Sequence, residues 1–343
     1  MKRFDLTKNY SFYSPSYVIE IYNKDKLEEY IYGYKEVNPK KELATKDTLY
    51  DIASLTKVYT SVLVYMAYEE KKLDIYGTIY NIENKFINLK DVTIIDLLSH
   101  NQNIWTNGYL GNAKNKEDFY NILYSAYVKE KVPTYVDTHY IILSTLLEKI
   151  YNKSYKELCI EKIFNKLNLK NTTFDPDSSL CASNNYEKTN EKTIDCIYPG
   201  LIHDTKGRIA KKYGIYTGHA SIFATGRDLF IFLKSFLDNT LLKKETINFM
   251  LKCRKIPNIY YPKATNFMGV RYRNILDKLN DIPTNASDNS ITFSGYTGPT
   301  FTIDFDKKII VIIMCNAIHN SRLTREKRKE IEIEIMNKIF NNI

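Results

Sequence analysis

The sequence predicts an α+β protein in which strands from both ends of the chain form one antiparallel sheet, flanked by helices, with a helical lobe inserted between them. Apolar and polar residues alternate near the N-terminus and again in the last third of the chain, which is typical of half-buried strands. Between these regions the apolar residues recur at helical spacing. We expect a single domain over residues 1–343, with an α/β part at approximately 1–75 and 220–343 and a helical part at approximately 76–219.

The first hundred residues predict one hairpin and two helices. Residues 16–36 alternate around the tetrapeptide N-K-D-K, which favours a tight turn between two strands. Helical periodicity runs from residue 54 to about residue 73. A second helix is expected over 91–100, where Thr93 is a candidate N-cap and Asp96 lies three residues later.

The remainder of the chain predicts more helices and then strands. Amphipathic helices are expected at 138–151, 154–167 and 224–239, the last entered through a Thr-Gly turn. Three consecutive antiparallel strands are expected at 290–297, 298–308 and 309–318, with D-K-K at one turn. A basic amphipathic helix is expected over 324–340.

Composition limits the classes of partner. The net charge is +9, but the lysines are spread along the chain and alternate with acidic residues, so we expect a solvated surface and no nucleic acid partner. The chain has no run of about 18 apolar residues, and no membrane segment is expected. The basic N-terminus lacks an apolar signal region. As given, the sequence indicates a cytoplasmic protein, or an extracytoplasmic one whose export segment has been removed.

The cysteines and histidines do not predict a metal site or a cofactor. The five cysteines are scattered without a C-x-x-C pair, which argues against a disulfide framework or structural zinc. No H-x-x-x-H or H-x-H spacing occurs, so His100, His203 and His219 are interpreted as structural hydrogen-bonding residues. His319 follows the last predicted strand and is expected to brace its end.

Ser54 and Lys57 lie three residues apart at the start of the first predicted helix, and no other serine has a lysine three residues later. Residues at this spacing share one helix face. A serine there lies beside unpaired backbone N–H groups, which favour a developing anion, and a buried lysine of lowered pKa could act as its base. The alternative is a helix cap beside a solvated charge.

Two further segments carry candidate site residues. Tyr135 and Asp137 immediately precede the predicted helix 138–151; the phenol could exchange a proton beside a lysine, or it could simply pack, and Asp137 is a candidate N-cap. Gly295 and Gly298 interrupt a strand pattern, either to let the backbone approach a ligand or to mark bends. Several aromatic residues could line a cleft or pack on the helical lobe: Trp105, Tyr109, Tyr120, Tyr124 and Tyr127.

Taken in order, S-L-T-K (54–57), Y-V-D (135–137) and F-S-G-Y-T-G (293–298) resemble the three active-site motifs of the serine β-lactamase and penicillin-binding-protein superfamily. The branch resembled has tyrosine in the second motif and includes class C β-lactamases, D-Ala-D-Ala carboxypeptidases, D-aminopeptidases and related esterases. The likeness covers roughly residues 16–340, including the segments V-T-I-I-D-L-L-S-H, P-G-L-I-H-D and G-H-A. It implies a β-lactamase/transpeptidase-like fold.

The resemblance also implies a role for each motif residue. Ser54 takes the position of the nucleophile, Lys57 that of its activating partner and Tyr135 that of the proton shuttle. Asp137 stands where an Asn or Asp would hydrogen-bond the lysine and a substrate amide. The oxyanion hole would be formed by the backbone N–H groups of Ser54 and Tyr296.

The third motif departs from the family pattern at its first residue. Phe293-Ser294-Gly295 stands where Lys-Thr-Gly or His-Thr-Gly is usual. Phe293 carries neither a hydrogen-bond donor nor a positive charge, whereas Ser294 keeps a hydroxyl and Gly295 an open backbone. This departure favours a peptidase or esterase over an efficient β-lactamase.

The resulting hypothesis is a serine hydrolase that forms an acyl-enzyme through Ser54 and acts on D-amino-acid peptides, esters or β-lactams. Its partner would be a small-molecule or peptide substrate, and no metal or organic cofactor is expected. Two alternatives are a penicillin-binding or sensor module that acylates without turnover, and an inactive protein of the same fold.

Overall fold

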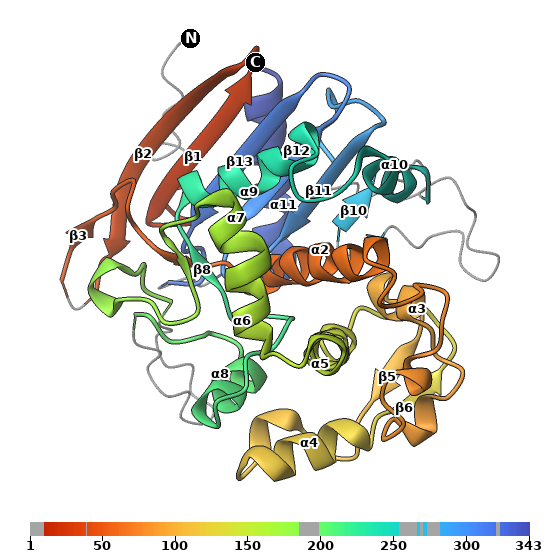
Figure 1. Ribbon diagram of the computed structural model, residues 1–343. Helices are drawn as coiled ribbons and strands as arrows, with labels where there is room; N and C mark the ends of the chain where they lie inside the picture. The colour runs from red at the N-terminus through yellow and green to blue at the C-terminus, as the bar shows by residue number, and fades with distance from the viewer. Residues whose placement is uncertain are drawn as a thin grey trace.

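The computed structural model describes residues 10–38, 40–184, 199–253, 266–267, 270–272, 282–319 and 323–343. Its largest element is an eight-stranded sheet with the order β3-β2-β1-β13-β12-β11-β10-β9 (Figure 1). The strands are β1 (Ser16–Asn23), β2 (Lys26–Glu36), β3 (Glu42–Leu43), β9 (Asn266–Phe267), β10 (Val270–Tyr272), β11 (Ser290–Ser294), β12 (Thr300–Asp304) and β13 (Ile309–Cys315).

The sheet joins the two ends of the chain, as predicted. Strand β1 pairs antiparallel with β2 on one side and with β13 on the other. Lys24 and Asp25 have φ angles of 50° and 59°, which a two-residue hairpin turn requires. Strands β11, β12 and β13 are consecutive and antiparallel, which confirms the C-terminal prediction. The sequence did not predict the short strands β9 and β10.

Alternation along the strands gives the sheet two different faces. Tyr17, Ile19 and Ile21 of β1 pack with α11 (Arg325–Phe340) in one apolar cluster. Their neighbours Val18 and Tyr22 belong to the larger cluster on the opposite face, where α9 (Gly226–Asp238) lies against the sheet. Helix α2 (Thr56–Glu69) continues this second layer (Figure 1).

Helix α2 is buried on all sides. Every residue from Thr56 to Ala67 is buried, because the sheet layer lies on one side of the helix and the inserted helices lie on the other. Buried threonine and serine hydroxyls of the helix form internal hydrogen bonds; for example, the Thr60 hydroxyl donates to the Gly218 carbonyl oxygen at 2.7 Å. The N-terminus of this central helix therefore lies at the junction of the two halves of the fold.

The inserted part contains most of the helices and one small sheet, and a second small sheet joins it to the rest of the fold. Its helices are α3 (Ile94–Leu98), α4 (Lys116–Tyr124), α5 (Thr138–Tyr151), α6 (Tyr155–Cys159), α7 (Asn165–Leu167) and α8 (Thr205–Lys212), and α10 (Lys244–Cys253) follows α9. Strands β5 (Asn103–Trp105) and β6 (Tyr127–Glu130) pair antiparallel on either side of α4 in the sequence, and β4 (Tyr50–Asp51), β8 (Phe223–Ala224) and β7 (Thr172–Thr173) form the second small sheet. The single-domain division made from the sequence stays a prediction.

The helix ends confirm some sequence predictions and correct others. Thr93 and Asp96 form the predicted capping box of α3. Asp137 occupies the N-cap position of α5, but its side chain makes no capping bond, because it is turned towards Lys57. The helix predicted over 154–167 is divided into α6, a π-helical turn (Ile160–Phe164) and α7.

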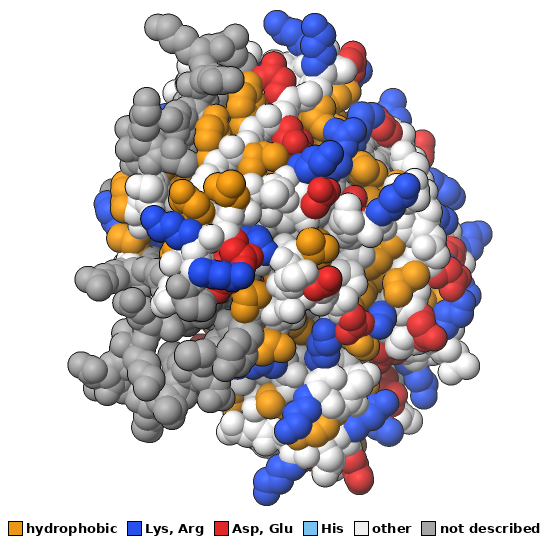
Figure 2. Space-filling view, turned by 90° about the vertical axis from the view of Figure 1, so that its left-hand side faces the viewer, with side chains coloured by type: hydrophobic (Ala, Val, Ile, Leu, Met, Phe, Trp, Pro, Cys, Tyr) orange, Lys and Arg blue, Asp and Glu red, His pale blue; other side chains and the backbone are white. Residues whose placement is uncertain are grey.

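The surface carries charges of both signs. On the face drawn in Figure 2, described Lys and Arg side chains are interspersed with Asp and Glu side chains. Several form exposed pairs, such as Lys327 with Glu330 and Lys153 with Glu161. Within the described ranges, no helix combines the length and the apolar character needed to cross a membrane.

Glu20 predicts an unusual pH dependence of stability. Its side chain is fully buried on the α9 face of β1, and Glu29 is its Cα partner on β2. Burial and the Glu29 carboxyl raise the pKa of Glu20 to about 8, so the folded protein keeps a proton that the unfolded chain loses near its ordinary pKa of 4.5. The folded state is therefore destabilised as the pH rises from about 4.5 to 8.

We expect Glu20→Gln to remove this loss of stability at rising pH. The variant's free energy of unfolding should exceed that of the wild type by an amount that grows by a few kcal/mol between about pH 5 and 8.5, since one pKa unit is about 1.4 kcal/mol. Urea unfolding at several pH values measures it. Glu28→Gln makes the same change at an exposed site of β2 and serves as the control. A Glu20→Gln difference that is constant with pH contradicts the assignment.

Candidate active site

Ser54 lies in a strained turn that precedes the central helix. The turn is a 3₁₀ segment (Ala53–Leu55), and α2 begins at Thr56, two residues later than the sequence analysis placed it. Ala53 has a φ of 45°, a left-handed conformation that costs a non-glycine residue about 1 kcal/mol. Surrounding contacts must therefore hold the turn in place.

Asp51 supplies those contacts. One of its carboxylate oxygens accepts from the Ala53 N–H at 2.8 Å, and the other accepts from the His203 N–H at 2.8 Å. Burial raises the pKa of this carboxyl to about 6 despite these bonds. The Thr297 hydroxyl donates to the Asp51 carbonyl oxygen at 2.6 Å and ties the turn to the segment after β11. Ser54 is consequently held half-buried with its side chain at the cavity described below.

Lys57 is fully buried and its ammonium has three acceptors. Nζ lies 3.0 Å from Ser54 Oγ, 2.9 Å from Asp137 Oδ1 and 3.2 Å from the His219 carbonyl oxygen. Burial would lower the pKa of Lys57, but the Asp137 carboxylate and the Tyr135 phenol raise it above its ordinary value. This corrects the expectation that burial would leave a free amine: the geometry is that of an ammonium donating all three N–H bonds.

Asp137 reaches Lys57 from the start of α5, 80 residues further along the chain. Its second oxygen, Oδ2, lies 3.0 Å from Nζ of Lys206. Burial would raise the pKa of Asp137, but the positive groups around it, led by Lys57, hold the pKa well below the usual range. Asp137 is thus an ionised carboxylate shared by two ammonium groups.

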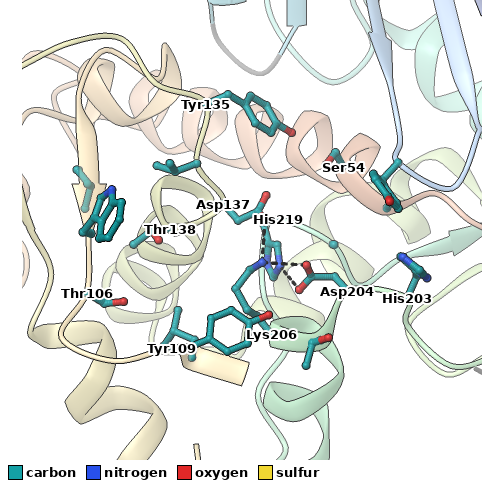
Figure 3. Close-up of a pocket in the computed structure, with 18 of the residues that line it drawn as sticks. Ser54, Thr106, Tyr109, Tyr135, Asp137, Thr138, His203, Asp204, Lys206 and His219 are labelled. Atoms are coloured by element: carbon teal, nitrogen blue, oxygen red, sulfur yellow. Dashed lines mark hydrogen bonds and ion pairs between the residues drawn. The ribbon is translucent and has the colours of Figure 1, made fainter. Parts of the chain in front are cut away.

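A second ion pair adjoins the first. Lys206 also lies 3.0 Å from Asp204 Oδ2, and Asp204 Oδ1 is 2.8 Å from His219 Nε2 (Figure 3). The pKa of Asp204 lies below its ordinary range, because its neighbours, chiefly His219, outweigh burial. The pKa of Lys206 is raised, because its two carboxylate partners outweigh burial.

Tyr135 lies beside Lys57 and is packed from behind. The centre of its ring is 5.0 Å from Lys57 Nζ. The His100 ring lies 4.5 Å away and the Phe293 ring 6.4 Å away, centre to centre. His100 shares a 2.7 Å contact between Nδ1 atoms with His139, whose pKa burial lowers to about 3. A neutral His139 therefore supports the ring on which Tyr135 rests.

The third motif is split between the core and the cavity. Phe293 is buried in the main apolar cluster, and the Ser294 hydroxyl accepts from Lys329 Nζ of α11 at 3.1 Å. Gly295 faces the Ser54 turn so closely that a Cβ atom would lie 2.5 Å from the Ile52 carbonyl oxygen. Tyr296 is exposed and stacks on His203 at 5.3 Å.

These elements surround one cavity of about 780 Å³. Of the predicted site residues, Ser54, Tyr135, Asp137 and Tyr296 line it, and Lys57 lies directly behind Ser54. Phe293, Ser294 and Gly295 stand behind this wall. Trp105 and Tyr109 also line the cavity, whereas Tyr120 and Tyr124 stack on each other in the helical part.

The sequence did not predict that Asp204 and Lys206 belong to the site. They lie in the H-D-T-K segment, where the resemblance was noted but no role was given to either residue. Their charges alone gave no signal, because Lys and Asp are abundant on the surface. The neighbouring histidines behave as interpreted: His219 bonds Asp204, and His319 Nε2 accepts from the Val37 N–H at 3.0 Å.

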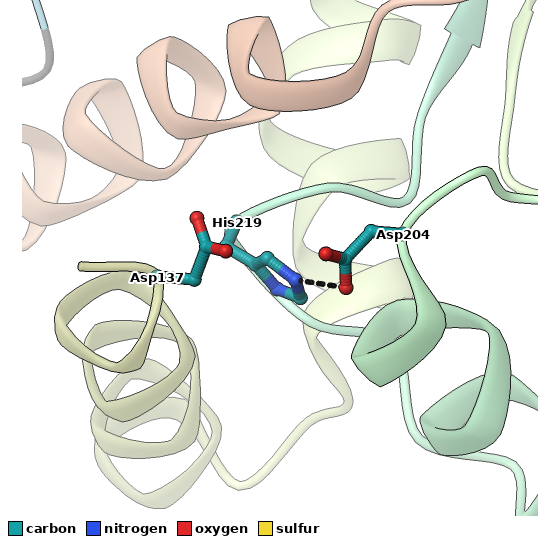
Figure 4. Close-up of side chains that lie close together, drawn as sticks. All are labelled: Asp137, Asp204 and His219. Carbon is teal, nitrogen blue, oxygen red and sulfur yellow. Dashed lines mark hydrogen bonds and ion pairs between the residues drawn. The ribbon is translucent and has the colours of Figure 1, made fainter. Parts of the chain in front are cut away.

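Asp137, Asp204 and His219 could be taken for a metal site. One donor atom from each lies within 4.8 Å of the other two. Figure 4 shows the three side chains, which come from the start of α5, the start of α8 and the loop before β8. However, Lys57 and Lys206 place an ammonium on each of these carboxylates. Their charges are therefore compensated by side chains of the same chain.

The comparisons with known proteins show the family and the fold of the chain. The family model described as Beta-lactamase matches residues 13–333. The chain is 23% identical over 330 residues to teichoic acid D-alanine hydrolase of Staphylococcus aureus, covering 94% of this chain and 75% of the relative. It is 22% identical over 342 residues to N-acetylmuramyl-L-alanine amidase of Bacillus subtilis, covering 88% and 76%.

A solved structure shows the same fold. EstCE1, described as a hydrolase with promiscuous acyltransferase activity, superposes with a TM-score of 0.75 at 16% identity, covering 97% of this chain and 96% of the other. At this identity the likeness concerns the fold; together with the Beta-lactamase family match over residues 13–333, it confirms the predicted β-lactamase/transpeptidase-like architecture.

Gly295→Ala should test the contact between β11 and the Ser54 turn. The added Cβ meets the Ile52 carbonyl oxygen at 2.5 Å and the Ala53 Cβ at 3.4 Å, so one segment must move. We expect the rate at which a fluorophosphonate labels Ser54 to fall by about 10-fold or more, because small displacements of reacting groups are costly.

Gly214→Ala is the matched control. Its Cβ would meet no atom within 4 Å, so only backbone strain at a φ of 73° is added. Its labelling rate should stay at the wild-type value. Circular dichroism checks that Gly295→Ala is folded. If the folded variant is labelled at the wild-type rate, the role given to this contact is wrong.

Proposed function

Because the chain belongs to the β-lactamase family, we propose that it is a serine hydrolase that forms an acyl-enzyme through Ser54. The observation that carries the proposal is the contact of Ser54 Oγ with a fully buried ammonium, Lys57 Nζ, at 3.0 Å on the wall of a cavity. A surface serine with a solvated lysine would not be buried in this way, and a helix cap would not direct its hydroxyl to a cation.

The first step would form the ester. Ser54 Oγ attacks a carbonyl carbon, the new C–O bond forms, and the carbonyl oxygen becomes an anion held by the backbone N–H groups of Ser54 and Tyr296. The anion then collapses and the bond to the leaving group breaks. Water cleaves the acyl-serine ester in the second step and regenerates Ser54.

Tyr135 would move the protons. Ser54 Oγ already accepts from Lys57, so the serine's own proton is directed elsewhere. Tyr135 lines the same cavity beside that ammonium, which stabilises negative charge on a phenol oxygen. In this proposal Tyr135 relays the proton: its oxygen accepts the Ser54 proton as its own hydroxyl proton passes to the leaving group, and Lys57 stays an ammonium that stabilises negative charge on both oxygens.

The substrate class follows from the third motif and the relatives. Phe293 is packed in the core, so β11 gives the cavity no positive charge for a substrate carboxylate. By their names, one relative is a teichoic acid D-alanine hydrolase and the other is an N-acetylmuramyl-L-alanine amidase, and only the first names a D-amino acid. We therefore infer that an ester or amide of a D-amino acid is the preferred acyl donor, ahead of a β-lactam. The compartment in which it acts stays a prediction.

Ser54→Ala should abolish the reaction. We expect fluorophosphonate to add its mass to the wild-type protein and not to Ser54→Ala, and p-nitrophenyl acetate hydrolysis to fall by about 10³-fold or more. Ser99→Ala, which removes a half-buried serine at the end of α3, is the control and should label normally. Equal labelling of Ser54→Ala and wild type would place the nucleophile elsewhere.

Paired substrates should measure the specificity. We expect the D-alanine p-nitrophenyl ester to be hydrolysed with a kcat/KM at least about 100-fold above that for nitrocefin, and above that for the L-alanine ester. Nitrocefin turnover comparable to that of a dedicated β-lactamase contradicts this inference. A stable penicillin adduct on Ser54 without turnover of any ester supports the sensor alternative, and no adduct with any probe supports the inactive one.

A further inference from the structure

The ionic groups behind Ser54 form a closed ring. Lys57 and Lys206 bind opposite oxygens of Asp137 at 2.9 and 3.0 Å. Lys206 bridges to Asp204 at 3.0 Å, and Asp204 contacts the His219 ring at 2.8 Å. The His219 carbonyl oxygen returns to Lys57 at 3.2 Å and closes the ring. Its members come from α2, the start of α5, the start of α8 and the loop before β8.

Lys206 is the member whose role is unexplained by the reaction. It lies at the cavity wall with 18% of its side chain exposed, and both of its oxygen contacts are to carboxylates. Its ammonium is 5.8 Å from the Tyr109 ring centre, which covers its open side. Asp204 is itself fixed, because its side chain caps α8 through the Gly207 N–H at 2.9 Å.

Without Lys206, the two carboxylates would face each other with no charge between them. Their oxygens and the His219 ring nitrogen lie within 4.8 Å of one another. Like charges at such separations repel strongly in a partly buried site. This repulsion would favour a rotation of the Asp137 side chain away from Asp204. Among the described residues, Asp137 is the only carboxylate that contacts Lys57.

We propose, on the basis of the proposed function, that Lys206 is a positioning residue: it is an internal counter-ion that holds Asp137 and Asp204 together and so fixes the oxygen to which Lys57 donates. Its ammonium occupies the place between two carboxylates and an imidazole where another protein could hold a divalent cation. It acts on Ser54 only through Asp137 and Lys57.

Two substitutions separate the charge of Lys206 from its volume. Lys206→Met keeps most of the volume and removes the charge; we expect the rate of Ser54 acylation to fall by between about 10-fold and 100-fold. Adding Asp204→Asn removes the opposing carboxylate charge and should restore at least about half of the lost rate on a logarithmic scale. A purely structural role for the lysine stem predicts no such rescue.

Lys206→Ala vacates the space and gives a second readout that does not need activity. We expect Zn²⁺ to raise the melting temperature of Lys206→Ala and EDTA to reverse the shift, because two carboxylates and an imidazole then lack a cation. The wild type and Lys206→Ala with Asp204→Asn should show a much smaller Zn²⁺ shift. All proteins are measured as full chains in the same buffer.

The outcomes distinguish this inference from the proposed function. If the wild type neither labels at Ser54 nor hydrolyses an ester, the proposed function fails, while the Zn²⁺ experiment still tests the counter-ion placement. If the wild type is labelled and Lys206→Met is acylated at the same rate as the wild type, the inference is overturned. A Zn²⁺ shift in Lys206→Ala no larger than in the wild type overturns the counter-ion placement independently.

Discussion

The arrangement of the site depends on the buried ammonium of Lys57. A charged group removed from water is stable only if it is paired and fully hydrogen-bonded. Its three acceptors come from the turn before α2, from the start of α5 and from the loop before β8. These segments must therefore converge on one point, and the cavity in front of Ser54 lies where they converge. The same requirement turns Asp137 away from capping α5.

The strained backbone at Ala53 and the close contact at Gly295 also help to position the turn that carries Ser54. Ala53 holds a left-handed conformation in a turn that is held by Asp51, whose carboxylate accepts from the Ala53 N–H and from the His203 N–H of another segment. Gly295 follows β11 and has no side chain, so its backbone can approach that turn closely. A Cβ atom at this position would lie 2.5 Å from the Ile52 carbonyl oxygen. The Thr297 hydroxyl donates to the Asp51 carbonyl oxygen, and Gly295 has no side chain, so the turn of Ser54 and the loop carrying Tyr296 lie in close contact.

The charges of the site are balanced within the chain itself. Two lysines and two aspartates alternate from Ser54 to His219, so each carboxylate has an ammonium partner. Apolar and aromatic groups stand behind Tyr135, namely Phe293 and the His100 ring. The cavity therefore combines a compensated ionic wall with aromatic surfaces, and Arg325 also lines it.

The sequence by itself determined the fold and the motif residues. Alternation at both ends of the chain predicted β1, β2 and the β11–β13 strands, because a period of two is a local property of the residues, and the order of the three motifs predicted which family was resembled. It did not determine that Asp137 leaves α5 uncapped, that Phe293 enters the core, or that Asp204 and Lys206 join the site. Those outcomes were decided by the tertiary structure, because they depend on which charges and rings meet across segments up to about 160 residues apart, as in the Lys57–His219 contact, and no local pattern records such a meeting.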